Sequence, residues 1–328
     1  MNALVVGLGS IGRRHLRNLR ALGLGEVWGC DPDAAAREAV RAEAGGHVFG
    51  DLVEALARRP EAVLVCTPTH RHLETARAAL AAGAHLFIEK PIAATLDGLG
   101  AFAAEASARR RVVLVGCNMR FHPGVQALKA SLETGRPRRP LYFRARFSHY
   151  LPNWRPGTDY RATYSARREE GGGILMEAVH ELDYLGWLGG DVGVATAWTG
   201  RVSDLEIDSE DYALVALSFK SGAQGQIHLD YVSSHKLRGC EVVGVDATLR
   251  WTSEGKAPER VRVTRATATT EEILFESPAW DGNEMYLAEL RHFVACVEGR
   301  ERPCLDAEGA GRVLELALAA REAAEASA

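Results

Sequence analysis

The sequence predicts an α/β fold in which an N-terminal doubly wound parallel sheet precedes an α+β domain with an open, mainly antiparallel sheet. Apolar runs such as 3–6, 62–66 and 84–88 alternate with helical stretches in the first part of the chain. Apolar strands that alternate with helices are typical of a parallel sheet covered on both faces. From 192 to about 275, successive strands separated by turns favour an antiparallel sheet. We therefore expect one domain over 1–120 and a second over 121–328.

Local patterns place the individual elements along the chain. In the first domain, strands are expected at 3–6, 26–31, 62–66, 84–88 and 112–116. One helix is expected to begin at about 11, two to span 33–44 and 51–59, one to end at about 82, and one to lie near 95–110. In the second domain, helices are expected at 123–133, 171–188, 282–298 and 307–324, with strands at 141–150, 192–202, 210–220, 223–233, 237–246, 247–252, 258–265 and 270–275.

Composition excludes several classes of protein. The chain of 328 residues has 39 basic and 43 acidic residues and a net charge of −4, without a basic block, so we expect no nucleic-acid partner. Its apolar runs are too short to span a membrane, and no charged leader precedes the first of them. The six cysteines lack C-x-x-C spacing, which predicts buried thiols in a reducing cytoplasm and no metal site.

A glycine motif follows the first strand. Gly7, Gly9 and Gly12 form G-x-G-x-x-G with Ser10 and Ile11 between them, directly after strand 3–6 and before a helical pattern. In a Rossmann domain these glycines make the tight turn, admit a pyrophosphate and bring the helix close to the strand. The motif predicts a dinucleotide cofactor.

An acidic residue completes this fingerprint. Asp31 ends the second strand at the distance where a carboxylate binds the adenosine ribose hydroxyls and repels a 2′-phosphate, so NAD is favoured over NADP. Arg37, about one helical turn later, could instead meet a 2′-phosphate. The alternative is a glycine turn of another α/β protein, in which Asp31 only caps the next helix.

One lysine stands out in an arginine-rich chain. Only five of the 39 basic residues are lysines, and Lys90 is the first of them. It follows strand 84–88, and ligands of doubly wound sheets bind at the carboxyl ends of strands. A cation there can stabilise a developing alkoxide, so Lys90 is a candidate catalytic residue. The alternative is an ordinary lysine paired with Glu89.

A histidine on the helix after the glycine triplet is the candidate general base. Glu177, His180 and Asp183 are spaced three apart, which places them on one side of a helix. A carboxylate neighbour orients an imidazole and stabilises its protonated form. The alternative is a core histidine whose nitrogens are satisfied by structure alone.

Five segments resemble one known family. The glycine motif, 66–74, the Glu89-Lys90-Pro91 tripeptide, 118–123 and 171–184 occur in the order seen in the Gfo/Idh/MocA family, which includes glucose–fructose oxidoreductase and inositol dehydrogenase. The resemblance spans essentially the whole chain. It implies a sugar or polyol dehydrogenase with Lys90 and His180 as acid/base pair. It also implies a homodimer or homotetramer formed through the C-terminal sheet.

The resemblance also assigns further residues to the site. Those implied near the cofactor are Thr67, Pro68, His72, Glu89, Asn118, Arg120, Trp154 and Arg155. For His72, a packing role is an equal alternative. The family commonly has an aspartate four residues before the histidine, whereas this chain has Met176 there, so either Glu177 or Asp183 could orient His180.

The loop over 151–168 suggests the substrate. Its arginines and tyrosines, among them Tyr160 and Arg161, favour a polyol with an anionic or nucleotide group, because guanidinium forks bind carboxylates and phosphates. A solvated loop is the alternative. Two other functions stay open: a C=N or C=C reductase related to biliverdin reductase, and a non-catalytic NAD(P)-binding sensor.

Overall fold

The structure is a computed structural model that describes residues 1–44, 47–155, 157–255 and 258–326. Two compact units are distinguished by their internal contacts, Met1–Cys117 with Tyr286–Leu314 and Asn118–Met285 with Glu315–Ala328. The sequence assigned all of 121–328 to a second domain, whereas the contacts group 286–314 with the first unit. No helix in the described part of the chain is both long and apolar enough to cross a membrane.

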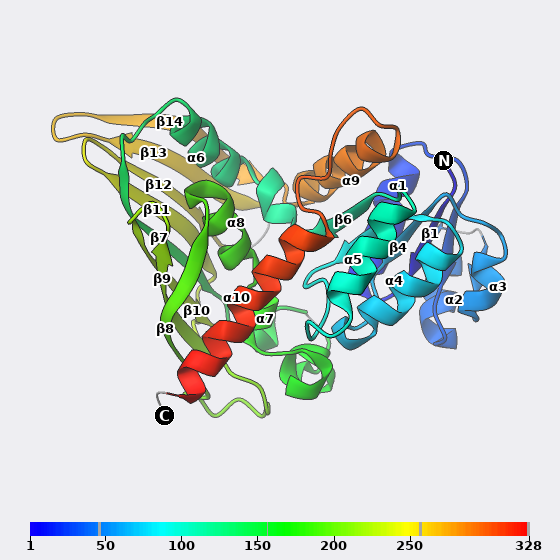
Figure 1. Ribbon diagram of the computed structural model, residues 1–328. Coiled ribbons are helices and arrows are strands. Elements are labelled where there is room, and N and C mark those ends of the chain that lie inside the picture. The colour runs from blue at the N-terminus through cyan, green and yellow to red at the C-terminus, as the bar shows by residue number, and fades with distance from the viewer. Residues whose placement is uncertain (45–46, 156, 256–257, 327–328) are drawn as a thin grey trace. The chain divides into compact units, whose positions relative to one another are not determined.

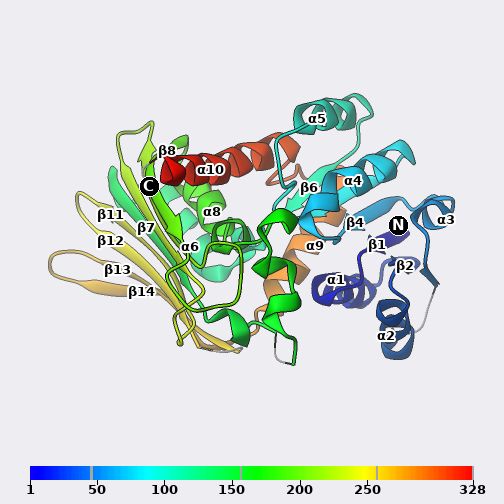
Figure 2. The same cartoon turned by 90° about the horizontal axis from the view of Figure 1, so that it is seen from below.

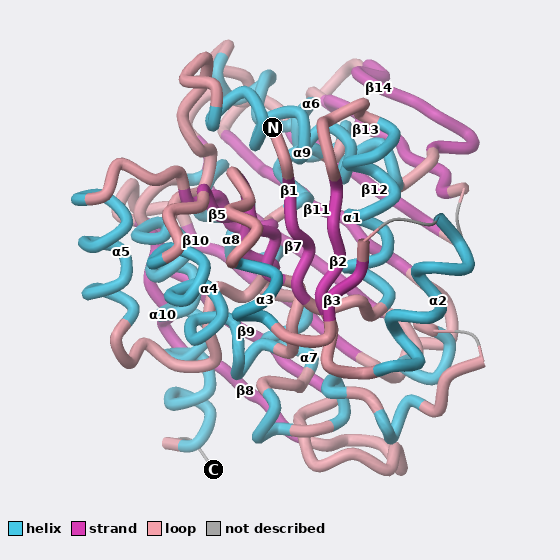
Figure 3. Tube along the Cα trace, turned by 90° about the vertical axis from the view of Figure 1, so that its right-hand side faces the viewer, coloured by secondary structure: helices cyan, strands magenta, loops and turns pink. Residues whose placement is uncertain are grey.

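The first unit is built on a parallel sheet, as predicted, with six strands where the sequence indicated five (Figure 1). The strand order is β3-β2-β1-β4-β5-β6, which reverses direction between β1 and β4. The strands are β1 (Ala3–Val6), β2 (Val27–Cys30), β3 (Val48–Phe49), β4 (Ala62–Val65), β5 (His85–Glu89) and β6 (Val113–Gly116). In Figure 3, β1, β2 and β3 run side by side. Doubly wound sheets bind ligands at such a reversal.

Helices cover this sheet on both faces (Figure 2). They are α1 (Ser10–Ala21), α2 (Ala34–Ala44), α3 (Leu52–Leu56), α4 (His72–Ala81), α5 (Leu99–Ala108) and most of α9 (Asn283–Val297). The start of α10 (Ala307–Glu325) also belongs to this unit. Leu16 of α1 and Phe293 of α9 share a buried cluster with Val5, Leu64 and Phe87 of the sheet. The late helix α9 therefore completes the core of the N-terminal sheet.

The second unit contains an eight-stranded sheet in the order β14-β13-β12-β11-β7-β10-β9-β8. All neighbours are antiparallel except β7 and β10, so the expected mainly antiparallel sheet is confirmed. Its strands are β7 (Pro140–Ser148), β8 (Val192–Gly200), β9 (Tyr212–Phe219), β10 (Gln224–Asp230), β11 (Leu237–Gly244), β12 (Thr248–Glu254), β13 (Glu259–Ala266) and β14 (Glu271–Trp280). Helices α6 (Pro123–Glu133) and α8 (His180–Gly189) pack on it through β12 and β7.

Three elements differ from the expected pattern. The helix expected over 171–188 is interrupted: α7 (Ile174–Glu177) ends, Ala178 leaves helical geometry, and α8 starts at His180. Glu177 and His180 therefore do not share one continuous helix. Helix α5 begins at Leu99 rather than near 95 because Gly98 adopts a left-handed conformation just before it. Strand β3 has two residues, too few to show a pattern.

Candidate functional site

The glycine loop of the first unit has three different steric environments. Gly7 has a φ of +92°, and a Cβ there would lie 2.5 Å from the carbonyl oxygen of Cys66. A Cβ on Gly12 would lie 1.8 Å from the carbonyl oxygen of Gly7. A Cβ on Gly9 would meet nothing within 4 Å among the described residues. Gly7 and Gly12 thus serve the turn and the helix contact, while Gly9 leaves space where a pyrophosphate approaches.

Helix α1 begins beside that space. Its first residue is Ser10, which is exposed, whereas Ile11 packs partly against the core. Gly9 is the N-cap residue of the helix. Because glycine has no side chain, this position supplies no side-chain hydrogen bond to the first N–H groups of the helix. Backbone N–H groups at a helix start bind phosphate oxygens well. The loop fits the pyrophosphate of a dinucleotide.

Asp31 lies directly after β2 and contacts the same loop. Its Oδ2 accepts a hydrogen bond from the Leu8 N–H at 2.7 Å, and its Oδ1 accepts one from the Asp33 N–H at 2.8 Å. It therefore does more than cap the next helix. A carboxylate has about four acceptor sites, so two bonds leave room for ribose hydroxyls. Arg37 donates through Nη1 to the carbonyls of Asp31 and Pro32, both at 2.8 Å.

Thr67 follows the end of β4, and His72 is the first residue of α4. The Thr67 hydroxyl is buried and has no hydrogen-bond partner among the described residues. A bound cofactor would supply a partner, which is a second observation that fits a dinucleotide. Pro68 precedes a helical turn over Thr69–Arg71. His72 is buried, and its ring nitrogens lie 2.8 Å from the carbonyl oxygens of Pro91 and Thr67, which supports the packing alternative.

Glu89 and Lys90 occupy the end of β5. The buried Glu89 carboxylate lies 2.6 Å from Nε2 of His15 and accepts the Lys90 backbone N–H at 3.2 Å. Burial raises the pKa of Glu89, but the hydrogen bond from His15 and the charge of Lys90 outweigh it and hold the pKa below its ordinary value. The carboxylate is therefore ionised beneath Lys90. The Lys90–Pro91 peptide bond is cis.

In the second unit, His180 is the first residue of α8 and is buried. Its two candidate carboxylates have other described partners. Glu177 accepts a hydrogen bond from Oγ of Ser165 at 2.9 Å. Asp183 accepts from Nε and Nη2 of Arg120 at 2.9 and 2.7 Å. Asp183 is thus held in a buried bidentate ion pair, whereas Glu177 accepts a hydrogen bond from a neutral hydroxyl.

Arg120 and Asn118 lie in the short helical turn Asn118–Phe121, and both are buried. The Arg120 guanidinium stacks 5.4 Å from the ring centre of Trp187 in addition to its pair with Asp183. These contacts connect the turn to α8. The expected contact of Asn118 and Arg120 with the nicotinamide end stays a prediction.

Trp154 and Arg155 are fixed by neighbours in the same unit. The indole N–H of Trp154 donates to the His149 carbonyl at 3.0 Å, and its ring meets the Tyr231 ring edge-on at 5.1 Å. Arg155 donates to Oγ of Ser165 at 3.2 Å. Because Ser165 also donates to Glu177, Arg155 and Glu177 are connected through one hydroxyl.

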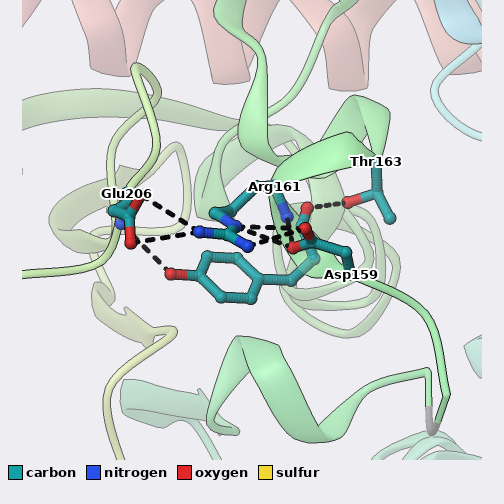
Figure 4. Close-up of polar contacts among 5 residues, drawn as sticks. Asp159, Arg161, Thr163 and Glu206 are labelled. Atoms are coloured by element: carbon teal, nitrogen blue, oxygen red, sulfur yellow. Dashed lines mark hydrogen bonds and ion pairs between the residues drawn. The ribbon is translucent and has the colours of Figure 1, made fainter.

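Tyr160 and Arg161, the expected substrate residues, both contact the exposed Glu206, and Figure 4 shows Arg161 between Glu206 and Asp159. Arg161 forks onto Asp159 through Nε and Nη2 and reaches Glu206 through Nη1 at 3.3 Å. The hydrogen bonds to these carboxylates raise the pKa of Arg161, so it is a permanent cation already neutralised by two anions. The Tyr160 hydroxyl accepts the Glu206 N–H at 3.3 Å. An anionic substrate would have to compete with both carboxylates.

Comparison with known families identifies the fold's relatives. Residues 1–117 match the family described as an oxidoreductase family with an NAD-binding Rossmann fold, and residues 125–250 match the GFO/IDH/MocA C-terminal domain. A 1,5-anhydro-D-fructose reductase from Ensifer adhaerens is 30% identical, over 98% of this chain and 95% of the relative. The chain belongs to the Gfo/Idh/MocA family.

Other Gfo/Idh/MocA members match over similar lengths. An inositol 2-dehydrogenase from Pseudomonas fluorescens is 29% identical over 97% of each chain. A scyllo-inositol 2-dehydrogenase (NAD(+)) from Bacillus subtilis is 26% identical over 96% of this chain and 92% of the relative. The chain is thus an oxidoreductase of a family of NAD-binding sugar and polyol dehydrogenases, and its N-terminal domain is an NAD-binding Rossmann domain.

Solved structures of a dehydrogenase and an oxidoreductase share the fold. The WlbA dehydrogenase from Bordetella pertussis, in complex with NADH and UDP-GlcNAcA, superposes with a TM-score of 0.82 at 23% identity and covers 99% of this chain and 97% of its own. An oxidoreductase from Agrobacterium radiobacter in complex with NAD+, L-tartaric acid and magnesium has a TM-score of 0.84 at 22% identity, with 100% and 97% coverage.

Sequence reasoning missed three polar residues that contact the predicted site residues. His15 bonds to Glu89, Ser165 connects Arg155 with Glu177, and Tyr231 packs on Trp154 with a buried hydroxyl. Ser165 and Tyr231 have no sequence signal. His15 lies three residues after the last motif glycine, on the helix turn facing the sheet, and that position was the available signal for it.

Proposed function

We propose that this protein is an NAD-dependent dehydrogenase that oxidises a CH–OH group of a sugar or polyol, with Lys90 and His180 as acid/base pair. The observation that carries the proposal is at the carboxyl edge of the first unit's sheet. There the glycine loop, Asp31, the unsatisfied Thr67 hydroxyl and the Glu89-supported Lys90 all follow parallel strands. The named relatives, which act on inositols or related sugars, support the substrate class.

Each residue has a stated role in the proposal. The glycine loop and Asp31 would hold NAD, which would supply the hydride acceptor for the substrate carbon. His180 takes the hydroxyl proton as the carbonyl forms, and the Lys90 ammonium stabilises the negative charge that develops on the oxygen. Glu177 is the better carboxylate to support a protonated His180, because Asp183 is neutralised by Arg120.

The substrate's charge is a finer part of the proposal. An anionic or nucleotide-linked sugar requires a cation in the second unit. Arg155 is better suited than Arg161, because its described contacts are a neutral hydroxyl and the Tyr164 ring at 5.4 Å. Arg161 is already paired with the carboxylates of Asp159 and Glu206. Substitution of Arg155 should therefore raise KM more for uronates and nucleotide sugars than for neutral inositols.

The experiment is a substrate panel followed by two substitutions. Inositols, hexoses, uronates and nucleotide sugars are mixed with protein and NAD or NADP, and reduction is followed by absorbance. Lys90→Met and His180→Gln should each lower kcat by about 10²–10⁴-fold on the best substrate. Lys220→Met is the matched control, because Lys220 is exposed and pairs with the exposed Asp191, and it should leave kcat unchanged.

Several outcomes would contradict the proposal. An unchanged rate in Lys90→Met would refute the catalytic assignment. Tighter binding of NADP than NAD would refute the argument from Asp31. Turnover only with C=N or C=C acceptors would indicate the reductase alternative, and cofactor binding without turnover of any substrate would indicate a sensor.

The proposal includes a homodimer or homotetramer in a reducing cytoplasm. The sheet of the second unit exposes aromatic side chains on the face away from its buried residues, among them Trp198, 56% exposed, and Tyr142. Exposed aromatic residues of this kind suit a contact with a second copy. All six cysteines are free thiols, which suits a reducing compartment.

A further inference from the structure

Two buried imidazoles contact the Glu89-Lys90-Pro91 segment. Nε2 of His15, on α1, lies 2.6 Å from Oε1 of Glu89. Nδ1 of His72, on α4, lies 2.8 Å from the carbonyl oxygen of Pro91. The residues immediately before and after Lys90 are therefore each bonded to a histidine from a different helix of the same unit.

The His15 contact fixes a charged group. His15 has no exposed surface, and its ring packs edge-on against Phe87 at 5.0 Å and Tyr286 at 6.0 Å. Its Nδ1 has no hydrogen-bond partner within the described chain, so Nε2, as the donor to Glu89, makes the described hydrogen bond of this ring. Glu89 then stays ionised and accepts the Lys90 N–H with its other oxygen.

The His72 contact joins two loops. Its Nε2 lies 2.8 Å from the carbonyl oxygen of Thr67, so one ring bridges the ends of β4 and β5. Burial lowers the pKa of His72, while its bonds to the two carbonyls oppose this shift. A neutral imidazole has one N–H, so it donates to one carbonyl at a time, and the second proton allows both bonds. The two ring nitrogens face different loops, and the tautomer decides which carbonyl accepts the single N–H of the neutral ring.

We propose that His15 and His72 are positioning residues for Lys90. His15 holds the carboxylate that precedes Lys90, and His72 holds the carbonyl that follows it while tying that carbonyl to Thr67. Neither needs to touch the substrate. The inference rests on the proposed catalytic function of Lys90.

Substitutions by asparagine and glutamine distinguish the two ring-nitrogen positions of His15. The amide nitrogen of glutamine is three bonds from Cβ, as is Nε2 of histidine, whereas that of asparagine is two bonds away, as is Nδ1. His15→Gln should therefore retain the bond to Glu89, and His15→Asn should lose it. We expect near-normal kcat in His15→Gln and a loss of about tenfold to hundredfold in His15→Asn.

Two further measurements distinguish positioning from general destabilisation. Without its donor, Glu89 should protonate at higher pH in His15→Asn only, and the infrared absorption of the protonated carboxyl group would follow this change. Hydrogen exchange of the Lys90 amide, followed by mass spectrometry, should accelerate in the same variant, because its acceptor is no longer fixed. Both measurements are independent of turnover.

For His72 the same substitutions have opposite effects. His72→Asn retains the Nδ1 position and the bond to Pro91, so kcat should stay near normal while NADH binding weakens about tenfold. His72→Gln retains the Nε2 position and the bond to Thr67, so NADH binding should be preserved and kcat should fall about tenfold or more. NADH affinity is measured by fluorescence titration.

His85→Asn is the matched control. His85 lies at the amino end of β5, and its Nδ1 accepts the Val112 N–H at 3.1 Å. It should alter neither kcat, the protonation of Glu89 nor NADH affinity. The inference is overturned if the Gln and Asn variants behave alike at both positions while Lys90→Met still abolishes turnover. If Lys90→Met leaves turnover intact, the proposed function fails instead, and the amide-exchange and NADH data still test the two contacts.

Discussion

Substitution of Gly9 separates cofactor binding from folding. Gly9 has φ −64° and ψ −167°, an extended conformation open to any residue, and a Cβ there meets nothing within 4 Å of the described chain. Gly9→Ala should therefore stabilise the protein by about 0.4–1 kcal/mol, because alanine reduces the entropy of the unfolded chain. The melting temperature without cofactor should rise by about 1–4 °C.

The same methyl group should weaken NADH binding. It occupies the space through which the backbone N–H groups of the loop approach the pyrophosphate. Loss of one charged hydrogen bond costs about 1.5–3 kcal/mol, which weakens affinity about tenfold to hundredfold. At an NADH concentration of about 100 times the wild-type Kd, binding stabilises the wild type by about 2.7 kcal/mol. The variant should gain only about 0.4–1.4 kcal/mol under these conditions.

Thermal melts with and without NADH measure both effects in one experiment. Gly12→Ala is the steric control, since its Cβ would lie 1.8 Å from a backbone oxygen, and it should lower the melting temperature without any cofactor present. The reasoning about Gly9 is refuted if Gly9→Ala binds NADH within twofold of the wild type. It is equally refuted if Gly9→Ala melts at a lower temperature than the wild type does without cofactor.

Three other predictions concern the second unit. Arg120→Met should lower the free energy of unfolding by about 3–5 kcal/mol, because it leaves the buried Asp183 uncompensated, and urea melts should show recovery when Asp183→Leu is added. Burial and nearby cations lower the pKa of His122 to about 3, so the unfolded chain binds a proton first as pH falls, and the free energy of unfolding should drop by about 2 kcal/mol from pH 7 to 5. His122→Asn, which keeps an acceptor for the Gly124 N–H, should lose that pH dependence. An unchanged dependence of the free energy of unfolding on pH in this variant would contradict the assignment. Trp198→Glu should reduce the mass measured by light scattering to that of one chain, unless the exposed sheet face makes no contact between copies.

Much of the fold could be predicted because its signals are local. The apolar strands and the turns between them predicted both sheets. The G-x-G-x-x-G motif could be interpreted because it joins a strand to a helix. The helix break at Ala178 was not predictable, since 171–188 has an uninterrupted helical pattern. The packing of α9 against the N-terminal sheet depends on Leu290 and Phe293. Their apolar character predicts that they are buried, but it does not indicate which element they pack against.

The candidate site was predictable as a set of residues but not as a set of contacts. Asp31 and Lys90 were found by their position after strands. Their partners are ordinary residue types at long sequence separations: His15 lies 74 residues from Glu89, and Arg120 lies 63 residues from Asp183. A single sequence contains no signal for such pairs. The Arg120 contact changed the interpretation of Asp183 from an orienting carboxylate to half of a buried ion pair.

The polar groups at the carboxyl edge of the first sheet fall into two kinds, and this division has consequences for mutagenesis. Glu89 and His72 are satisfied by other protein groups, so their substitution perturbs the placement of Lys90. The Thr67 hydroxyl has no described partner, and Gly9 borders open space, so both can contribute fully only when a ligand is bound. Substitution of Glu89, or loss of the His72 bond to Pro91, should therefore change kcat or stability before it changes cofactor affinity. Thr67→Val should do the reverse, because it removes a buried hydroxyl that costs the free protein desolvation energy and benefits only the complex.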